Sequence, residues 1–303
     1  MRTMVVGGAG FIGSHLVDRL LAEQHSVDVV DDLSSGSLAN LAAARAAGGE
    51  LKIHNIDVCA DEFGSLVAMR NPEVIYHLAW LPPGRTTTAE LARAVHGTLN
   101  VLEASRLAGP AKVVAAVSAT AIYGDVPARE QPVKEGRVGA LPGPVGVIAH
   151  AVLELFAAYR RDHDVEFTVL AMSSVYGPRQ RPDGGVVGAF AHAVRRREVP
   201  VITGDGRQSR DFLYIDDAVD ACIRAALRGG GLVINVGTGV STTVRDLWNL
   251  LAGPDQAMPR HEAAVAGDIA RLALSPTRAR IQLAWAPWTV LEHGLRNLAT
   301  HHE

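Results

Sequence analysis

Three glycines at the spacing GxxGxxG, placed directly after the first apolar run, constrain the fold of this chain more than any other feature. The run Thr3 to Val6 predicts a buried strand, and the residues from Phe11 to Ala22 have helical spacing. The turn between them holds Gly7, Gly10 and Gly13. A turn without side chains lets the backbone approach a phosphate and lets the helix close on the strand. The pattern therefore predicts a Rossmann-type dinucleotide site.

A carboxylate indicates which dinucleotide is bound. Asp31 follows the second predicted strand, Ser26 to Val30, eighteen residues after the last of the three glycines. An acidic side chain there bonds the adenosine ribose and repels a 2′-phosphate. Asp32 and the small polar residues after it leave room for a phosphate, so NADPH stays an alternative. We expect an NAD(P)(H) cofactor, with NAD(H) favoured, whose pyrophosphate lies on the amides of Phe11 and Ile12.

Short apolar runs alternate with helical stretches over the first two thirds of the chain. The further predicted strands are Leu51 to His54, Val74 to His77, Lys112 to Val117 and Phe167 to Met172. This alternation predicts an α/β fold with a Rossmann-type, doubly wound parallel sheet. After Tyr176, glycine and proline separate shorter elements, which predicts a smaller carboxy-terminal substrate lobe. We expect residues 1–172 and about 208–236 to form the dinucleotide-binding domain, and about 173–207 and 237–303 to form the lobe.

Composition excludes several classes of protein. The 303 residues carry a net charge of −3 without a basic cluster, so no nucleic-acid partner is expected. The apolar runs are too short to span a membrane, and the chain opens directly into a strand, which favours a cytoplasmic protein. Two cysteines, and twelve histidines without the spacing of a zinc site, indicate neither a disulfide framework nor a metal centre.

A series of motifs follows in one order along the chain. These are GGAGFIGSH from Gly7, DDLSSG from Asp31, YHLAW from Tyr76, GTLNVLEAS from Gly97, AIYG from Ala121, VYGPRQ from Val175, GDGRQSRDFLYIDD from Gly204 and NVGTG from Asn235. On these motifs the chain resembles the extended short-chain dehydrogenase/reductases of the nucleotide-sugar epimerase and dehydratase type over nearly its whole length. The resemblance implies that Asp57 and Val58 meet the adenine, and that Leu78 and Ala79 lie beside the dinucleotide.

The same resemblance implies a catalytic Ser/Thr, Tyr and Lys, and the chain departs from the family here. Aligned on the motifs, these three positions hold Ala119, Val145 and Ala149. In the family the tyrosine exchanges a proton with the substrate while the lysine lowers its pKa. In lacking these three residues, the chain resembles atypical ketoreductases that act on angucyclinone polyketides.

The residues that serve the sugar phosphates in the family are also changed. Ala171 and Ser174 stand where the family carries an arginine and an asparagine. Arg210, whose counterpart grips the diphosphate, is retained. An ion pair with Asp211 or Asp216 is the alternative role for Arg210.

Several other side chains near the predicted strand ends can still take part in chemistry. The candidates for proton transfer are Ser118, Tyr123 and Ser174. Those for contact with the substrate are Trp80, Thr120, Met172 and Arg210. None of the three hydroxyls has an adjacent cation to activate it, so we expect the substrate itself or water to supply the proton.

Three classes of function stay open. The first is an NAD(P)H-dependent ketoreductase that reduces a carbonyl of an aromatic polyketide without a catalytic tyrosine. The second is a nucleotide-sugar epimerase or dehydratase with rearranged acid–base residues, which the retained Arg210 supports. The third is a non-catalytic NAD-binding protein. The apolar helix from Val145 to Arg161 resembles the family's dimer helix, and we expect a homodimer that binds a small-molecule substrate.

Overall fold

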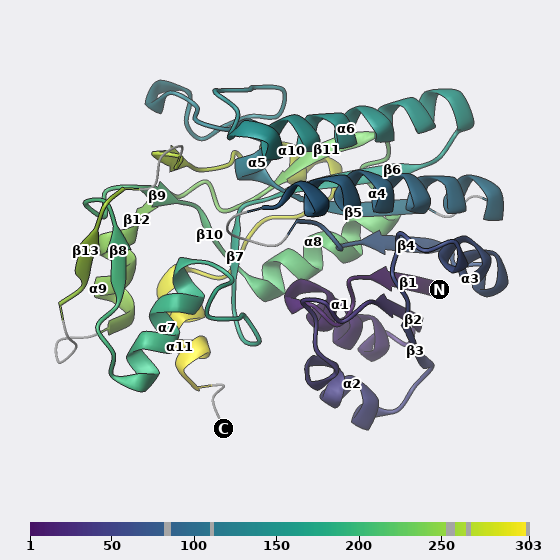
Figure 1. The fold of residues 1–303 in the computed structure, drawn as a ribbon, viewed down its shortest axis with the longest axis horizontal. Coiled ribbons are helices and arrows are strands. Elements are labelled where there is room, and N and C mark those ends of the chain that lie inside the picture. The colour runs from purple at the N-terminus through teal and green to yellow at the C-terminus, as the bar shows by residue number, and fades with distance from the viewer. Residues whose placement is uncertain (82–85, 110–111, 253–257, 265–267, 301–303) are drawn as a thin grey trace.

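The computed structural model describes residues 1–81, 86–109, 112–252, 258–264 and 268–300. A large sheet flanked by helices takes up most of the molecule, and shorter strands and helices form a lobe at one end (Figure 1). This arrangement confirms the predicted Rossmann-type α/β fold.

The central sheet has seven strands in the order β11-β6-β5-β4-β1-β2-β3, and every neighbouring pair is parallel. The strands are β1 (Arg2–Val6), β2 (Ser26–Asp31), β3 (Leu51–Asn55), β4 (Val74–His77), β5 (Lys112–Ser118), β6 (Phe167–Met172) and β11 (Leu232–Val236). Parallel strands bring their carboxyl ends to one edge of the sheet, and ligands bind at that edge in folds of this kind.

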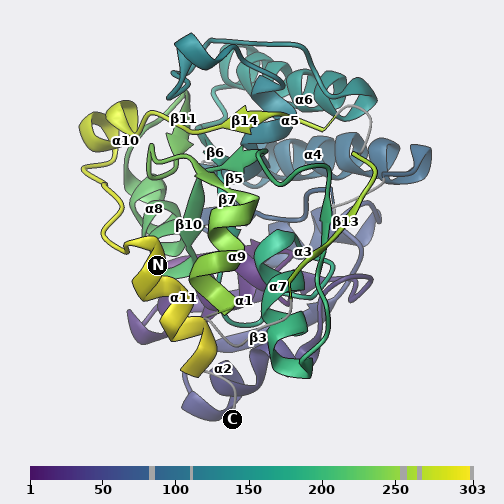
Figure 2. The ribbon, with the colours of Figure 1, turned by 90° about the vertical axis from the view of Figure 1, so that its left-hand side faces the viewer.

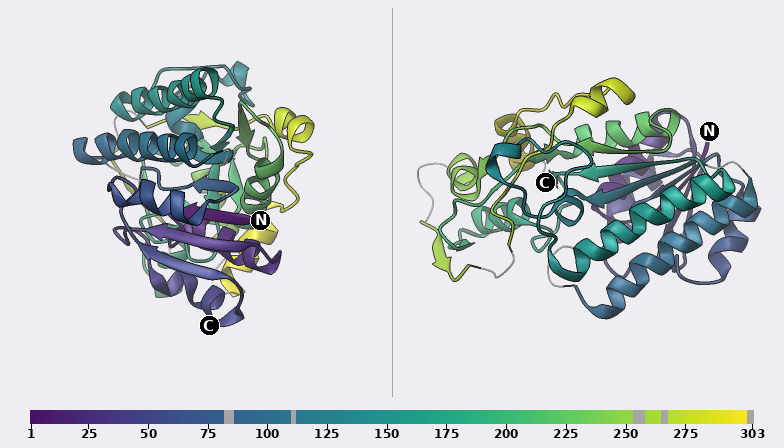
Figure 3. Two further views of the ribbon diagram at one scale, coloured as in Figure 1. Left: turned by 90° about the vertical axis from the view of Figure 1, so that its right-hand side faces the viewer. Right: turned by 90° about the horizontal axis from the view of Figure 1, so that it is seen from above.

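Helices cover both faces of the sheet and produce two apolar cores. One core joins β1 and β2 to α1 (Phe11–Ala22) and α8 (Ile215–Leu227). The other joins the opposite face to α3 (Glu62–Arg70), α4 (Thr88–Ala108) and α6 (Gly143–His163), and α4 and α6 lie side by side (Figure 3). Alternate residues of β1 serve the two cores: Val5 belongs to the first, and Met4 and Val6 to the second.

The lobe contains short strands in small sheets (Figure 2). β7 (Ser174–Tyr176) pairs with β10 (Phe212–Tyr214), β8 (Val201–Thr203) pairs with β13 (Arg260–Glu262), and β9 (Ser209–Arg210) lies between β12 (Thr242–Thr243) and β14 (Arg271–Leu272). Its helices are α7 (Val186–Arg196), α9 (Val244–Ala252) and α11 (Leu291–Thr300). The predicted domain boundaries stay a prediction.

Within the described ranges, five short helices connect the larger elements. They are the 3-10 helices η1 (Leu38–Leu41) and η2 (Ala128–Glu130) and the α-helices α2 (Ala42–Ala47), α5 (Ala119–Tyr123) and α10 (Thr277–Gln282). Among the helices of the described ranges, none is long and apolar enough to cross a membrane.

Candidate active site

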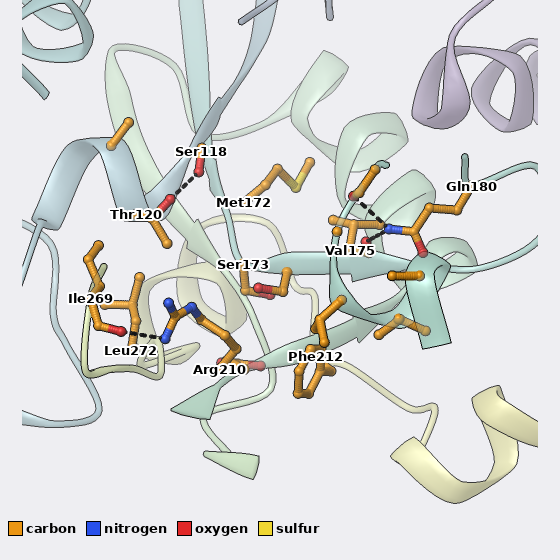
Figure 4. Close-up of a pocket in the computed structure, with 18 of the residues that line it drawn as sticks. Ser118, Thr120, Met172, Ser173, Val175, Gln180, Arg210, Phe212, Ile269 and Leu272 are labelled. Atoms are coloured by element: carbon orange, nitrogen blue, oxygen red, sulfur yellow. Dashed lines mark hydrogen bonds between the residues drawn. The ribbon is translucent and has the colours of Figure 1, made fainter. Parts of the chain in front are cut away.

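A cavity of about 1010 Å³ lies between the carboxyl edge of the sheet and the lobe (Figure 4). The sheet side contributes residues from the ends of β4, β5 and β6, and the lobe side contributes residues from β8, β10 and α7. This is where a doubly wound sheet places its ligand.

The glycine turn after β1 has no room for side chains. Gly7 has a φ of +82°, and a Cβ atom on it would lie 2.8 Å from the backbone nitrogen of Ala79. A Cβ atom on Gly13 would lie 2.1 Å from the carbonyl oxygen of Gly7. Helix α1 then begins after Gly10 without a side-chain cap, so its first amides are left for an anion. The turn fits a dinucleotide pyrophosphate.

The residues predicted beside this turn lie around it. Phe11, Ile12 and Leu78 line the cavity, whereas Ala79 packs its backbone against Gly7. The assignment of these four residues to the cofactor stays a prediction.

Asp31 ends β2 as expected, but its carboxylate is largely enclosed. It is 8% exposed, and its two oxygens accept hydrogen bonds from the backbone nitrogens of Ala9 and Leu33, each at 2.9 Å. Loss of solvent on burial raises the pKa of this carboxyl group. Asp31 therefore ties the glycine turn to the loop after β2, in addition to the ribose contact that the sequence predicts.

Asp57 and Val58 follow β3 and are held by α4. The side-chain amide of Asn100 donates to the carbonyl oxygen of Val58 at 2.9 Å. The Arg93 guanidinium donates to both oxygens of Asp57, at 2.6 and 3.0 Å, and this contact lowers the pKa of that carboxyl group. The predicted contact with adenine is not tested by these bonds.

A pair of hydroxyls stands at the end of β5. The oxygens of Ser118 and Thr120 are 2.7 Å apart, and both residues line the cavity (Figure 4). Across the cavity floor, Met172, Ser173 and Ser174 line it from the end of β6 and the start of β7. The structure therefore brings the predicted Ser118, Thr120, Met172 and Ser174 to one cavity, and their roles stay predictions.

Tyr123 does not reach this cavity, which corrects its candidacy as a proton donor. Its side chain is 1% exposed, and its hydroxyl donates to Asn235 Oδ1 at 2.6 Å. The amide nitrogen of Asn235 in turn donates to the carbonyl oxygen of Val133. Burial raises the pKa of the phenol. Tyr123 is thus a structural residue that joins α5 to β11.

The helix predicted to carry the family's catalytic pair is α6. Val145, in its first turn, is half-buried and lines the cavity, while Ala149 is fully buried. No tyrosine of the sequence is followed four residues later by a lysine. Among the described lining residues there is no tyrosine, lysine, histidine or cysteine. The described lining thus offers hydroxyls and the carboxylates of Asp183, Asp211 and Asp268, but no phenol, amine, imidazole or thiol.

Arg210 lies in the cavity wall and is paired with an aspartate that we did not predict. Its Nη1 donates to the carbonyl oxygen of Ile269 (Figure 4) and to that of Ser209. Its Nη2 is 2.6 Å from Asp268 Oδ1. The expected partners Asp211 and Asp216 are therefore wrong. Asp268 is 58 residues away in sequence, so local spacing could not indicate it.

Asp211 instead anchors the lobe. Its carboxylate accepts hydrogen bonds from the backbone nitrogens of Thr238, Gly239 and Leu274, at 2.8 to 3.0 Å. The side chain is 1% exposed. These bonds join three segments of the chain at the cavity, whose lining includes Asp211.

Trp80, predicted to contact substrate, also lines the cavity, and the walls near it are mostly apolar. Taken together, the sheet topology, the glycine turn and the cavity define a dinucleotide-binding α/β fold with an appended lobe. The comparisons with known proteins give the family.

The chain belongs to the NAD dependent epimerase/dehydratase family, whose model matches residues 3–237. It is 40% identical to a UDP-glucose 4-epimerase of Mycolicibacterium smegmatis over 97% of this chain and 96% of that protein. It is also similar to solved structures. One is the UDP-glucose 4-epimerase of Thermotoga maritima with UDP-glucose, at a TM-score of 0.88 and 33% identity, which covers 98% of this chain and 97% of the other. Another is the Thermus thermophilus enzyme with NAD, at a TM-score of 0.88 and 30% identity, which covers 99% and 98%.

These relatives confirm the resemblance to extended dehydrogenase/reductases and the nicotinamide dinucleotide as the cofactor class of the family. The narrower resemblance, to the angucyclinone ketoreductase of simocyclinone biosynthesis, receives no support from them. The relatives are named for nucleotide sugars, so they favour the second class of function named above. The protein is an enzyme of the NAD-dependent epimerase/dehydratase type.

Proposed function

We propose that the protein acts on the sugar of a nucleoside diphosphate sugar, as a 4-epimerase with NAD(H) as its resident cofactor. The observation that supports this most strongly is the 40% identity to a UDP-glucose 4-epimerase across almost the full length of both chains. The cavity suits a ligand that extends from the end of the sheet, where a nicotinamide ring would lie, towards Arg210 in the lobe.

When bound, the dinucleotide would supply reversible hydride transfer with the carbinol carbon of the substrate. The chain's own residues then have three tasks. The turn at Gly7 and the first amides of α1 hold the pyrophosphate. The hydroxyls of Ser118 and Thr120 hydrogen-bond the reacting oxygen. Arg210 contacts the diphosphate while it keeps its ion pair with Asp268.

The proton must take a different route from the one that the family uses. A serine or threonine hydroxyl titrates far above neutral pH, so the Ser118–Thr120 pair can orient the substrate oxygen and relay a proton but is a poor base. We infer that water in the cavity carries the proton. The UDP-glucuronic acid 4-epimerase of Bacillus cereus has been solved as a tyrosine-to-phenylalanine variant with NAD, and its rate can be compared with that of this protein.

A second candidate, reduction of a ketone on an aromatic polyketide, is favoured by the lining of the cavity. Trp80, Val145, Met172 and Phe212 present apolar surface, and the cation Arg210 is already paired with Asp268. A flat neutral substrate suits such walls better than a diphosphate does. The substrate would then assist its own protonation through a hydroxyl beside the ketone.

One experiment separates the two functions. The protein would be incubated with NAD and UDP-glucose, UDP-galactose or UDP-glucuronic acid, and separately with NADH or NADPH and a panel of aromatic polyketide ketones. Product formation would be followed by NMR and by absorbance at 340 nm. We expect interconversion of 4-epimers, absent in Gly7→Val. Ketone reduction without any epimerisation would contradict the first proposal and support the second.

A further inference from the structure

Arg93 joins two loops that border the adenosine half of the dinucleotide site. Its Nη1 is 2.6 Å from Asp57 Oδ2, and its Nη2 lies 3.0 Å from Asp57 Oδ1 and 2.9 Å from Asp32 Oδ2. One guanidinium therefore bridges two carboxylates that are 25 residues apart in sequence. No sequence motif marked this residue.

The position of the bridge follows from the sheet. Asp32 comes directly after β2 and Asp57 shortly after β3, and these two strands are parallel neighbours at one edge of the sheet (Figure 1). The carboxyl end of β2 carries Asp31, where the adenosine ribose of a dinucleotide binds in this fold. The base attached to that ribose must therefore lie close to the two loops that Arg93 connects.

The local structure of α4 aims Arg93 at this point. The helix begins with a capping box, in which Thr87 Oγ1 accepts from the Glu90 nitrogen and the Glu90 carboxylate accepts from the Thr87 nitrogen. This box fixes the first turn, and Arg93 follows it in the second. Further along the same helix, Asn100 holds the carbonyl oxygen of Val58, so α4 grips the loop after β3 at two points.

The bridge places a positive charge among three carboxylates beside the predicted adenosine site. Asp31, Asp32 and Asp57 would repel one another and a negatively charged ligand if nothing compensated them. Arg93 places one positive charge between two of these carboxylates, and its guanidinium contact lowers the pKa of Asp57. The side chain still has 47% of its surface exposed. A planar cation that carboxylates hold in place and that stays partly exposed can pack on an aromatic ring.

We propose that Arg93 is a positioning residue for the adenosine half of the cofactor. Its guanidinium holds the loops after β2 and β3 in place, and the exposed part of its side chain packs on the adenine ring. This role rests on the family's dinucleotide cofactor and does not depend on which substrate the enzyme uses.

The test compares ligands that contain the adenosine half with one that lacks it. NADH, ADP-ribose and reduced nicotinamide mononucleotide would be titrated calorimetrically into the wild type, Arg93→Gln and Arg93→Lys. Arg106→Gln is the matched control, because Arg106 lies on the same helix and pairs with Glu103 away from the site. Thermal melting of each variant would show whether the fold is retained.

For Arg93→Gln we expect about tenfold weaker binding of NADH and ADP-ribose, which is about 1.4 kcal/mol. The mononucleotide should bind within threefold of the wild type. The affinity of Arg93→Lys for NADH and ADP-ribose should fall between that of the wild type and that of Arg93→Gln, because lysine keeps the charge but lacks the planar guanidinium. Arg106→Gln should bind all three ligands as the wild type does. The proposal is overturned if Arg93→Gln binds ADP-ribose within twofold of the wild type, or if it weakens the mononucleotide as much as NADH. If Arg93→Gln does not fold, Arg93→Lys decides by the same criteria.

Discussion

The two ends of the cavity are built in different ways. At the cofactor end the surface offered to the pyrophosphate is backbone, made by a glycine turn and the first amides of α1, and the buried side chain of Asp31 holds the turn to its neighbouring loop. At the substrate end they come from side chains, such as Ser118, Thr120, Trp80 and Arg210. The comparison teaches that the glycine turn, which the backbone makes, fits the family's pattern, whereas the side-chain positions are where the motif alignment predicts a departure from the family.

The difference has a physical reason. The glycine turn does not tolerate side chains, because a Cβ atom on Gly7 or Gly13 would collide with the backbone. A side chain that points into a cavity can be exchanged without moving its neighbours. Val145 illustrates this: it occupies the position implied for the catalytic tyrosine, is half-buried, and leaves α6 in place.

The largest effect is expected at the cofactor end. Gly7→Val should weaken NADH binding more than a hundredfold, because its Cβ would lie 2.8 Å from the nitrogen of Ala79 at a φ that side chains rarely adopt. Fluorescence titration with NADH measures this. Gly64→Ala is the control, since a Cβ there meets nothing within 4 Å. If Gly7→Val binds NADH within threefold of the wild-type affinity, the glycine turn is not part of the cofactor site.

The next effect concerns the choice of cofactor. We expect the wild type to bind NADH at least tenfold more tightly than NADPH, because Asp31 repels a 2′-phosphate. Asp31→Asn should narrow this ratio and weaken both cofactors, since an amide cannot accept from both Ala9 and Leu33 through two oxygens. Dissociation constants of both cofactors with both proteins test the point. A wild-type preference for NADPH would show that the loop after Asp32 overrides the carboxylate.

Smaller effects are expected at the substrate end. Ser118→Ala and Ser174→Ala should each lower kcat by less than about tenfold, or about 1.4 kcal/mol of barrier. A true general acid or base contributes about 10²–10⁴-fold, and neither hydroxyl has a partner that would activate it. Single-turnover rates with saturating cofactor give the answer. A thousandfold loss in Ser118→Ala, with cofactor affinity unchanged, would identify it as the missing proton donor.

Tyr123 should affect stability and leave the chemistry almost unchanged. In Tyr123→Phe we expect kcat within threefold of the wild type and a free energy of unfolding lower by about 1–3 kcal/mol, because the Oδ1 atom of Asn235 loses its buried donor. Urea denaturation and steady-state kinetics measure the two quantities. A large loss of kcat at unchanged stability would show that Tyr123 takes part in the reaction.

The smallest effect expected is that of pH. The described lining includes the carboxylates of Asp183, Asp211 and Asp268 but no histidine, cysteine, tyrosine or lysine. Burial raises the pKa of Asp211, whose oxygens accept hydrogen bonds from the backbone behind it, and burial lowers the pKa of nearby His77 to about 4. His77 therefore stays neutral from pH 6 to 9. We expect kcat to change less than about threefold over that range, without the limbs that an acid and a base produce. A bell-shaped profile would point to a titrating group that the described lining does not contain.

The parts of the fold that could be predicted from the sequence have local causes. The strand Val74–His77 and the helix Phe11–Ala22 were predicted at their observed bounds, because apolar runs and the glycine turn mark them. The pairing of Arg210 with Asp268 and the bridge made by Arg93 could not be predicted. Each depends on side chains brought together by chain segments far apart in sequence, and no periodicity records such contacts.

The candidate site was predicted in a similar way. Residues at strand ends, such as Ser118 and Met172, reached the cavity because the sheet edge fixes where they lie. Tyr123, five residues beyond β5, was misplaced because one turn of helix α5 directs its ring into the core towards Asn235. The direction of a side chain in a five-residue helix depends on its packing, which spacing alone does not reveal.

The glycine turn after β1 also has a meaning for how such a protein can change over time. A cofactor held by the main chain stays bound while the residues around its reactive ring are replaced one by one. Loss of a proton-transferring side chain then slows a reaction without emptying the site, and the bound dinucleotide remains available for another substrate. The same property makes Val145 a suitable position for engineering, since a phenol introduced there would enter a scaffold that already supplies the hydride.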